Sequence, residues 1–215
     1  MKAPIKKESM QKAREKSKRK KELLTRRAAQ LFLKHGYEKT TTNDIAKAIG
    51  IKGPSVYHYF KSKEEILLGI FNKVDEIFEE KIFREAEKAA SSEEKLRVVV
   101  RNSLESIFKL GGEFPFLMFD QPPVKKYAAN RKKRSKQVVN FARGIIEDIV
   151  RERDLKDPID STVAAYSLIA LSVWPFKWFN PKGKMSLEEL ADSITRFFLQ
   201  GLCGKEVALP KHPDM

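Results

Sequence analysis

The sequence predicts an all-α protein, and three observations lead to this fold class. Apolar residues recur at intervals of three and four along most of the chain, which is the period of one helix face. Serine followed three residues later by glutamate occurs at Ser62, Ser91 and Ser186, and this pair is typical of helix starts. No stretch alternates with a period of two for long enough to form a sheet.

Each expected helix has a start or stop signal in the sequence. The first ends at His35-Gly36, Pro54 suits the first turn of a short helix, and Pro122-Pro123 separates two later segments. Asp157-Pro158 begins the helix that reaches an aromatic cluster near Trp178. The expected helices are Lys21 to Lys34, Asn43 to Ile49, Gly53 to Tyr59, a long helix from Ser62, Ser91 to the break at Gly111-Gly112, a short piece over 114–119, Val124 to Arg153, 158–178 and 186–201.

Residues 40–63, TTTNDIAKAIGIKGPSVYHYFKSK, have the spacing of a DNA-reading helix-turn-helix. A small residue, Ala46, lets two helices cross closely, and Gly50 can adopt the positive φ of the tight turn. Val56 closes a small core with the isoleucines around the turn, Ile45, Ile49 and Ile51. An ordinary helical hairpin is the alternative interpretation of this segment.

Charge supports a polyanion partner for the same part of the chain. The chain has a formal net charge of +14, and residues 1–63 contain 18 Lys/Arg against 5 Asp/Glu. Ten of these basic residues lie in residues 1–21, which have almost no large apolar side chains, so we expect a disordered basic arm there. The arm either follows DNA phosphates or serves only as a solubilising tail.

Composition restricts the remaining possibilities. A single cysteine, Cys203, excludes an internal disulfide framework and fits a reducing compartment. The N-terminus has no apolar signal region, and the longest apolar stretch, Val163 to Trp174, is too short to span a bilayer. We therefore expect a cytoplasmic protein. Four catalytic or nucleotide-binding patterns (HExxH, GxSxG, Walker A and GxGxxG) do not occur, which argues against an enzyme.

These observations predict a division into four parts. Residues 1–20 form the arm, 21–66 a three-helix DNA-binding domain, 67–204 a helical ligand-binding and dimerisation domain, and 205–215 a tail. The last two helices have broad apolar faces, which either lie within the core or pair with a second subunit in a four-helix interface. A homodimer would place two readers on successive major grooves, about 34–36 Å apart.

The first 70 residues resemble the DNA-binding domain of the TetR family of transcriptional regulators. The resemblance rests on Phe32, Gly36-Tyr37, Thr40-Thr41-Thr42, Asp44-Ile45-Ala46, Gly50, Val56-Tyr57-His58-Tyr59-Phe60 and Lys63-Glu64. It implies an all-α homodimer, usually a repressor, that leaves double-stranded operator DNA when a small molecule binds the C-terminal domain. The DNA-contacting positions it implies are Thr41, Thr42, Asn43, Lys52, Ser55, Tyr57, His58, Tyr59 and Lys63.

The C-terminal part carries a second resemblance. Residues 174–186, WPFKWFNPKGKMS, are similar to a stretch in the TetR subgroup that senses acyl-CoA thioesters. Pro175 should kink its helix, and a basic run over 125–134 would meet CoA phosphates or be a solvated face. The residues expected to line an acyl tunnel, or else to form ordinary core, are Phe108, Phe114, Phe116, Met118, Phe119, Trp174, Trp178 and Phe197.

Two alternatives to this function stay open at the sequence level. A sequence-indifferent nucleic-acid-binding protein would bind through the basic arm and show no preferred site. A regulator of a cationic or aromatic drug-like ligand would need carboxylates in its pocket, for which Glu113 and Asp120 are the candidates. We expect no metal, because His58 has no second ligand nearby in the sequence, and no resident cofactor beyond a small-molecule effector such as an acyl-CoA.

Overall fold

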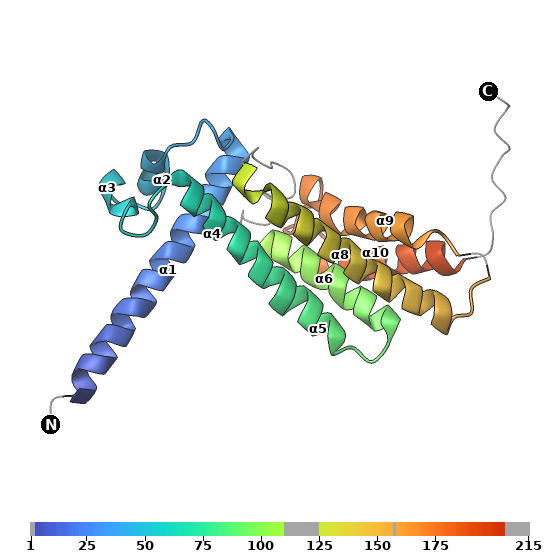
Figure 1. The fold of residues 1–215 in the computed structure, drawn as a ribbon. Helices are drawn as coiled ribbons and strands as arrows, with labels where there is room; N and C mark the ends of the chain where they lie inside the picture. Colours follow the sequence, from blue (N-terminus) through green and yellow to red (C-terminus); the bar gives the residue numbers. More distant parts are fainter. Residues whose placement is uncertain (1–2, 110–124, 157, 205–215) are drawn as a thin grey trace. The chain divides into compact units, whose positions relative to one another are not determined.

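The computed structural model describes residues 3–109, 125–156 and 158–204, and the side chains of 10–108, 130–156 and 158–204 (Figure 1). Every regular element in these ranges is helical, which confirms the predicted fold class. The chain divides into two compact units. Unit 1 contains Met1–Glu79 and Ser106–Asn130, and unit 2 contains Glu80–Glu105 and Arg131–Met215. None of the described helices is long and apolar enough to cross a membrane.

Unit 1 is built on four helices. α1 (Ala3–His35) packs against α4 (Lys63–Glu76) and α2 (Thr42–Ala48), and α2 packs against the short α3 (Gly53–Val56). Their shared core contains Leu24, Ala28, Phe32, Ile45, Val56, Phe60, Ile66 and Ile70, all of them 2 % exposed or less. Gly69 permits close packing inside this core, because a Cβ there would lie 3.2 Å from the Phe60 ring and 3.3 Å from the Thr25 hydroxyl.

The structure differs from the predicted disordered arm over residues 1–20. α1 begins at Ala3 and continues without interruption into the core of unit 1. The segment is rich in Ala, Lys, Arg, Glu and Gln, which are strong helix formers, and it has no Gly or Pro between Ile5 and His35. The predicted domain boundary at residue 66 also falls inside α4, which runs on to Glu76.

Unit 2 contains most of the long helices. They are α5 (Arg84–Glu87), most of α6 (Ser92–Lys109), most of α8 (Lys125–Glu152), α9 (Ser161–Val173), the 3-10 turn η2 (Trp174–Lys177) and α10 (Leu187–Cys203). A π-helical stretch, η1 (Ile77–Phe83), lies between α4 and α5 and includes the residues where one unit gives way to the other. Ser92 at the start of α6 donates a 2.7 Å hydrogen bond to Glu152 at the end of α8.

Two predicted helices end earlier than the sequence indicated. α3 stops at Val56 rather than Tyr59. Pro175 does not kink a continuing helix, because α9 already ends at Val173 and Pro175 lies in the first turn of η2. The proline therefore begins a tighter turn at a position where its missing N–H breaks no helical hydrogen bond.

Candidate nucleic-acid interface

The start of α2 is fixed by a reciprocal capping box. Thr41 is the N-cap, and its hydroxyl oxygen accepts a hydrogen bond from the Asp44 amide while its own amide donates to the Asp44 carboxylate at 2.9 Å. The Thr41 hydroxyl also donates to that carboxylate at 2.6 Å, and these bonds lower the pKa of Asp44. Thr41 and Thr42 thus occupy the N-terminal turn predicted for them, where backbone N–H groups favour an anion.

The turn between α2 and α3 has the predicted geometry. Gly50 has a φ of +70°, which confirms that this position needs glycine. The Ala46 carbonyl accepts hydrogen bonds from the Ile49 amide at 3.2 Å and from the Ile51 amide at 3.0 Å, so the turn that contains Gly50 folds back onto the end of α2. Ala46 itself is buried, and this lets the two helices approach closely.

Residues from both helices meet beside the first turn of α3. The Tyr57 hydroxyl lies 3.3 Å from the Thr42 hydroxyl, and Tyr57 remains 56 % exposed. The Asn43 amide lies directly over Gly53, because a Cβ on Gly53 would be 2.0 Å from Asn43 Oδ1. Lys52, the N-cap of α3, makes no side-chain capping bond and is exposed. The structure therefore gathers polar groups of two helices on one surface that solvent reaches.

The other predicted DNA contacts have different environments. His58 is exposed next to Tyr57, whereas Ser55 and Tyr59 are half-buried. We call the set Thr42, Asn43, Lys52, Ser55, Tyr57 and His58 the reading surface. Its members lie on α2, at the N-cap of α3, on α3 and in the turn that follows α3.

Lys63 has a role that the sequence did not reveal. Its ammonium group donates hydrogen bonds to the Tyr37 carbonyl at 2.9 Å and the Glu38 carbonyl at 3.4 Å, and it lies 4.2 Å from the centre of the Tyr37 ring. The first residue of α4 is thereby tied to the loop between α1 and α2. A phosphate contact by Lys63, as predicted, would require this side chain to leave or share these partners.

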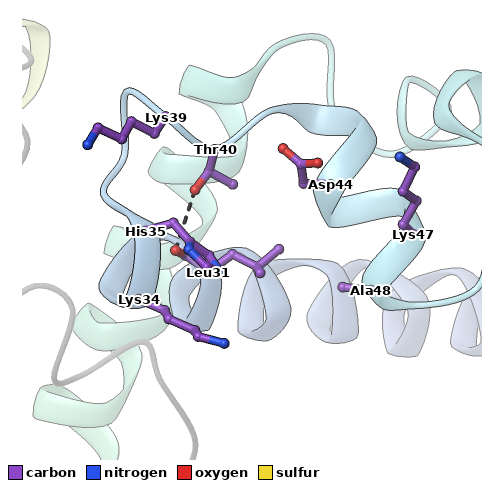
Figure 2. Close-up of a pocket in the computed structure, with 8 residues that line it drawn as sticks. All are labelled: Leu31, Lys34, His35, Lys39, Thr40, Asp44, Lys47 and Ala48. Carbon is purple, nitrogen blue, oxygen red and sulfur yellow. Dashed lines mark hydrogen bonds between the residues drawn. The ribbon is translucent and has the colours of Figure 1, made fainter.

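A basic groove of about 830 Å³ borders α2 on the side of α1. Figure 2 shows the residues that line it, which come from the end of α1 (Leu31, Lys34 and His35), the loop that follows (Lys39 and Thr40) and α2 (Asp44, Lys47 and Ala48). The Thr40 hydroxyl anchors the loop by donating to the Gly36 carbonyl at 2.9 Å, with a longer contact to the Leu31 carbonyl at 3.4 Å. The groove adds positive charge next to the N-terminus of α2.

Only part of the predicted ligand pocket falls within the described residues. Phe114, Phe116, Met118 and Phe119 lie outside them, and Phe108 on α6 is half-buried. Trp174, Trp178 and Phe197 are 58 %, 60 % and 66 % exposed, so they face solvent in a single chain rather than lining a closed cavity. Of the basic run, Lys132 and Lys133 are exposed on α8.

Unit 2 also has a polar groove of about 540 Å³ that the sequence did not predict. Arg97 on α6 donates to Asp192 on α10 at 2.6 Å and lies 3.6 Å from Glu188, and the Arg97 guanidinium lowers the pKa of Asp192. Cys203 lines the same groove, and burial raises the pKa of its thiol. Arg97 and Asp192 are 95 residues apart in sequence, which no local pattern reports.

Two protein families match successive parts of this chain. Residues 24–70 match the family described as bacterial regulatory proteins, tetR family, and residues 89–202 match a tetracyclin repressor-like C-terminal domain. The HTH-type transcriptional repressor KstR2 of Rhodococcus jostii (strain RHA1) is 30% identical over 186 residues, covering 81% of this chain and 87% of the relative. The fatty acid metabolism regulator protein of Bacillus subtilis (strain 168) is 22% identical over 183 residues, covering 83% and 93%.

Solved structures agree with these relatives. The crystal structure of AibR in complex with isovaleryl coenzyme A and operator DNA superposes with a TM-score of 0.69 at 26% identity, covering 81% of this chain and 95% of that one. Apo AibR gives a TM-score of 0.71, also at 26% identity, covering 82% and 97%. Together, the two domain matches and the KstR2 relative establish that this chain belongs to the tetR family of bacterial regulatory proteins.

Proposed function

We propose that this transcriptional regulator is a homodimeric repressor that a fatty acyl-CoA releases from its operator. The reading surface is the observation that carries the proposal. It presents exposed hydroxyl, amide and ammonium groups of two helices around the first turn of α3, and these are the groups that contact base edges and phosphates. Unit 1 also concentrates positive charge beside this surface, through Lys34, Lys39 and Lys47.

The ligand class is supported by relatives and by chemistry. AibR was crystallised with isovaleryl coenzyme A, and the Bacillus subtilis relative is named as a fatty acid metabolism regulator. The exposed lysines of α8, Lys132 and Lys133, are suited to the phosphates of CoA. Residues 174–186 resemble the aromatic–proline stretch of regulators that sense acyl-CoA thioesters.

Dimer formation is supported by the exposed apolar side of α9. Val163 and Tyr166 are more than half exposed, and with the exposed Ala170 they follow the three- and four-residue spacing of one helix face. Trp174, the first residue of η2 directly after α9, is 58 % exposed. Phe197 on the neighbouring α10 is 66 % exposed. Large apolar groups clustered on two packed helices are costly in water, and a second copy of the same helices would cover them.

Lys63 supplies a route by which α4 can affect DNA binding. Its hydrogen bonds to the carbonyls of Tyr37 and Glu38 attach the start of α4 to the loop that leads to Thr41, the N-cap of α2. A shift of α4 would therefore displace the start of α2 as well. The effector achieves release only by binding the DNA-free conformation more tightly than the DNA-bound one.

The test is fluorescence anisotropy on DNA from immediately upstream of the gene, with scrambled DNA of equal length as the control. Acyl-CoAs of increasing chain length, free CoA and free fatty acids are added to the preformed complex. We expect preferential binding by about 10³ over scrambled DNA at physiological salt. We also expect acyl-CoAs of one chain-length class to release the protein from the DNA, and free CoA and free fatty acids not to do so.

Two variants locate the binding surface. Lys52→Ala on the reading surface should weaken operator binding about tenfold or more, whereas Lys81→Ala on unit 2 should leave it unchanged. Preferential binding that no thioester reverses would reject the ligand class. Equal binding to both DNAs would replace the repressor with a sequence-indifferent nucleic-acid binder.

A further inference from the structure

The N-terminal half of α1 extends away from the core of its unit. In Figure 1 the blue end of α1 reaches well beyond α2, α3 and α4. From Met10 to Leu23 nearly every described side chain is exposed, and the buried positions begin at Leu24. Near the end of this stretch the Lys21 ammonium lies 4.9 Å from the centre of the Phe60 ring, where the core begins. We call residues 3–23 the helical arm.

The charge of the helical arm defines the class of partner. Residues 10–23 contain seven Lys/Arg and two Glu, and their large apolar side chains are limited to Met10 and Leu23. A helix that docks in a protein groove or lies on a membrane needs a continuous apolar face, which this segment lacks. A net charge of this size on an exposed helix instead fits a polyanion.

The helical arm is attached to the DNA-binding part of the chain, which makes DNA the expected polyanion. The same helix supplies Leu24, Ala28 and Phe32 to the core that carries α2 and α3, so the arm has a fixed direction relative to the reading surface. Its 21 residues span about 30 Å at 1.5 Å per residue, which is the length of about nine base pairs. This reach is enough to extend beyond the base pairs that a short recognition helix touches.

We propose that the helical arm binds the phosphates of the duplex flanking the operator and adds affinity without reading sequence. The inference rests on the proposed DNA-binding function and adds a second contact surface to it. A helix of fixed direction loses little conformational freedom on binding, so its phosphate contacts need not compensate for the ordering of a flexible tail.

The test compares the wild-type protein with a variant carrying Arg14→Gln, Lys16→Gln and Lys20→Gln, three positions with no glutamate three or four residues away. Glutamine has nearly the same helix propensity as lysine and arginine, so circular dichroism should show unchanged helix content. The matched control removes three exposed lysines of unit 2, by Lys81→Gln, Lys88→Gln and Lys156→Gln. Affinity for operator and for scrambled DNA is measured between 50 and 200 mM salt.

We expect the plot of log K against log salt to become shallower by about 0.9 for each phosphate that the arm no longer neutralises. A loss of three phosphate contacts in the whole complex, out of the six basic groups replaced in the two arms of a dimer, makes the affinity of wild type fall about 40-fold more across this salt range than that of the arm variant. The ratio of operator to scrambled affinity should stay within about twofold. The matched control should keep the wild-type slope.

Duplex length provides an independent measurement. Adding about ten base pairs on each side of a minimal operator should raise the affinity of wild type and of the matched control, and raise that of the arm variant far less. The proposal would be overturned if all three proteins had the same salt dependence and gained the same affinity from the longer duplex. If the arm variant lost its preference for operator over scrambled DNA, the arm would contribute to sequence recognition, contrary to the proposal. If wild type does not distinguish operator from scrambled DNA, the proposed repressor function fails, while the slopes on either DNA still decide the role of the arm.

Discussion

Gly53 offers a way to disturb the reading surface without disturbing the fold. A Cβ added at this position would lie 2.0 Å from Asn43 Oδ1 and 3.2 Å from Asn43 Cγ, so Gly53→Ala must displace the Asn43 amide. Asn43 is exposed, and its amide can rotate into solvent at a cost of about 1 kcal/mol or less. Alanine gains up to about 1 kcal/mol over glycine as a helix former, so the free energy of unfolding should change by less than about 1 kcal/mol.

The effect on DNA should be larger than the effect on stability. An asparagine amide in contact with a base contributes about 1–3 kcal/mol of discrimination, so moving it should weaken operator binding about 5- to 150-fold per half-site. The assay is a double-mutant cycle of Gly53→Ala and Asn43→Ala, read by anisotropy on the operator, with urea unfolding as the stability control. In the Asn43→Ala background, Gly53→Ala should change affinity by less than about twofold.

Two outcomes would refute this reasoning. If Gly53→Ala weakens binding equally with and without the Asn43 side chain, the glycine acts through its own approach to DNA and not through the displaced amide. If the variant loses more than about 2 kcal/mol of stability, Asn43 cannot swing away as its exposure indicates, and the affinity change reports misfolding.

Four further perturbations follow from the same structure. Gly50→Ala should lower the free energy of unfolding in urea by about 1–2 kcal/mol, because alanine is strained at a φ of +70°. The loss should not exceed this value, because no atom lies within 4 Å of the added Cβ, and Gly50→Asn should cost less because asparagine tolerates this φ better. Lys63→Gln should lower the free energy of unfolding by about 1 kcal/mol, because its hydrogen bonds to two carbonyls are removed. Arg97 lowers the pKa of Asp192, so the ionised carboxylate stabilises the fold at pH values above its ordinary pKa of 3.8. Wild type should therefore have a higher Tm than Asp192→Asn at pH 6, and this difference should shrink as the pH falls below 3.8. Phe197→Glu should shift the dimer toward monomer in sedimentation equilibrium, and an unchanged mass would exclude that helix face as the interface.

Helix starts were the most predictable part of the fold, because their signals lie within four residues. Ser186 and Glu189 form the expected reciprocal box. At Ser62 only half of the box forms, since Ser62 accepts from the Glu65 amide while the Glu65 carboxylate accepts from Lys61 instead. The Ser–x–x–Glu pattern thus locates the helix start, but which backbone amide donates to the glutamate carboxylate depends on the conformation of the residues just before the helix.

The reading surface was partly predictable for a related reason. Gly50 acts through local turn geometry, which spacing predicts, whereas Thr42, Asn43 and Tyr57 were expected beside that turn only from the resemblance to the TetR family. The position of Lys63 was not available from spacing, because its partners Tyr37 and Glu38 lie 26 and 25 residues earlier. The spacing of apolar residues also does not predict the π-helical turns of η1, which interrupt the long helix expected from Ser62.

The helical arm shows how composition and pattern can point in different directions. Composition alone predicts disorder, since lysine and arginine are abundant and apolar residues are scarce. The order of the charges favours a helix, because Glu8, Glu15 and Glu22 each stand four residues before a basic residue, at Lys12, Arg19 and Arg26. Glutamate four positions ahead of lysine or arginine is the orientation that stabilises an isolated helix, by about 0.2–0.5 kcal/mol per pair. Charges in this order favour the continuation of a helix that the core already nucleates at Leu24, over a segment for which composition alone predicts a flexible tail.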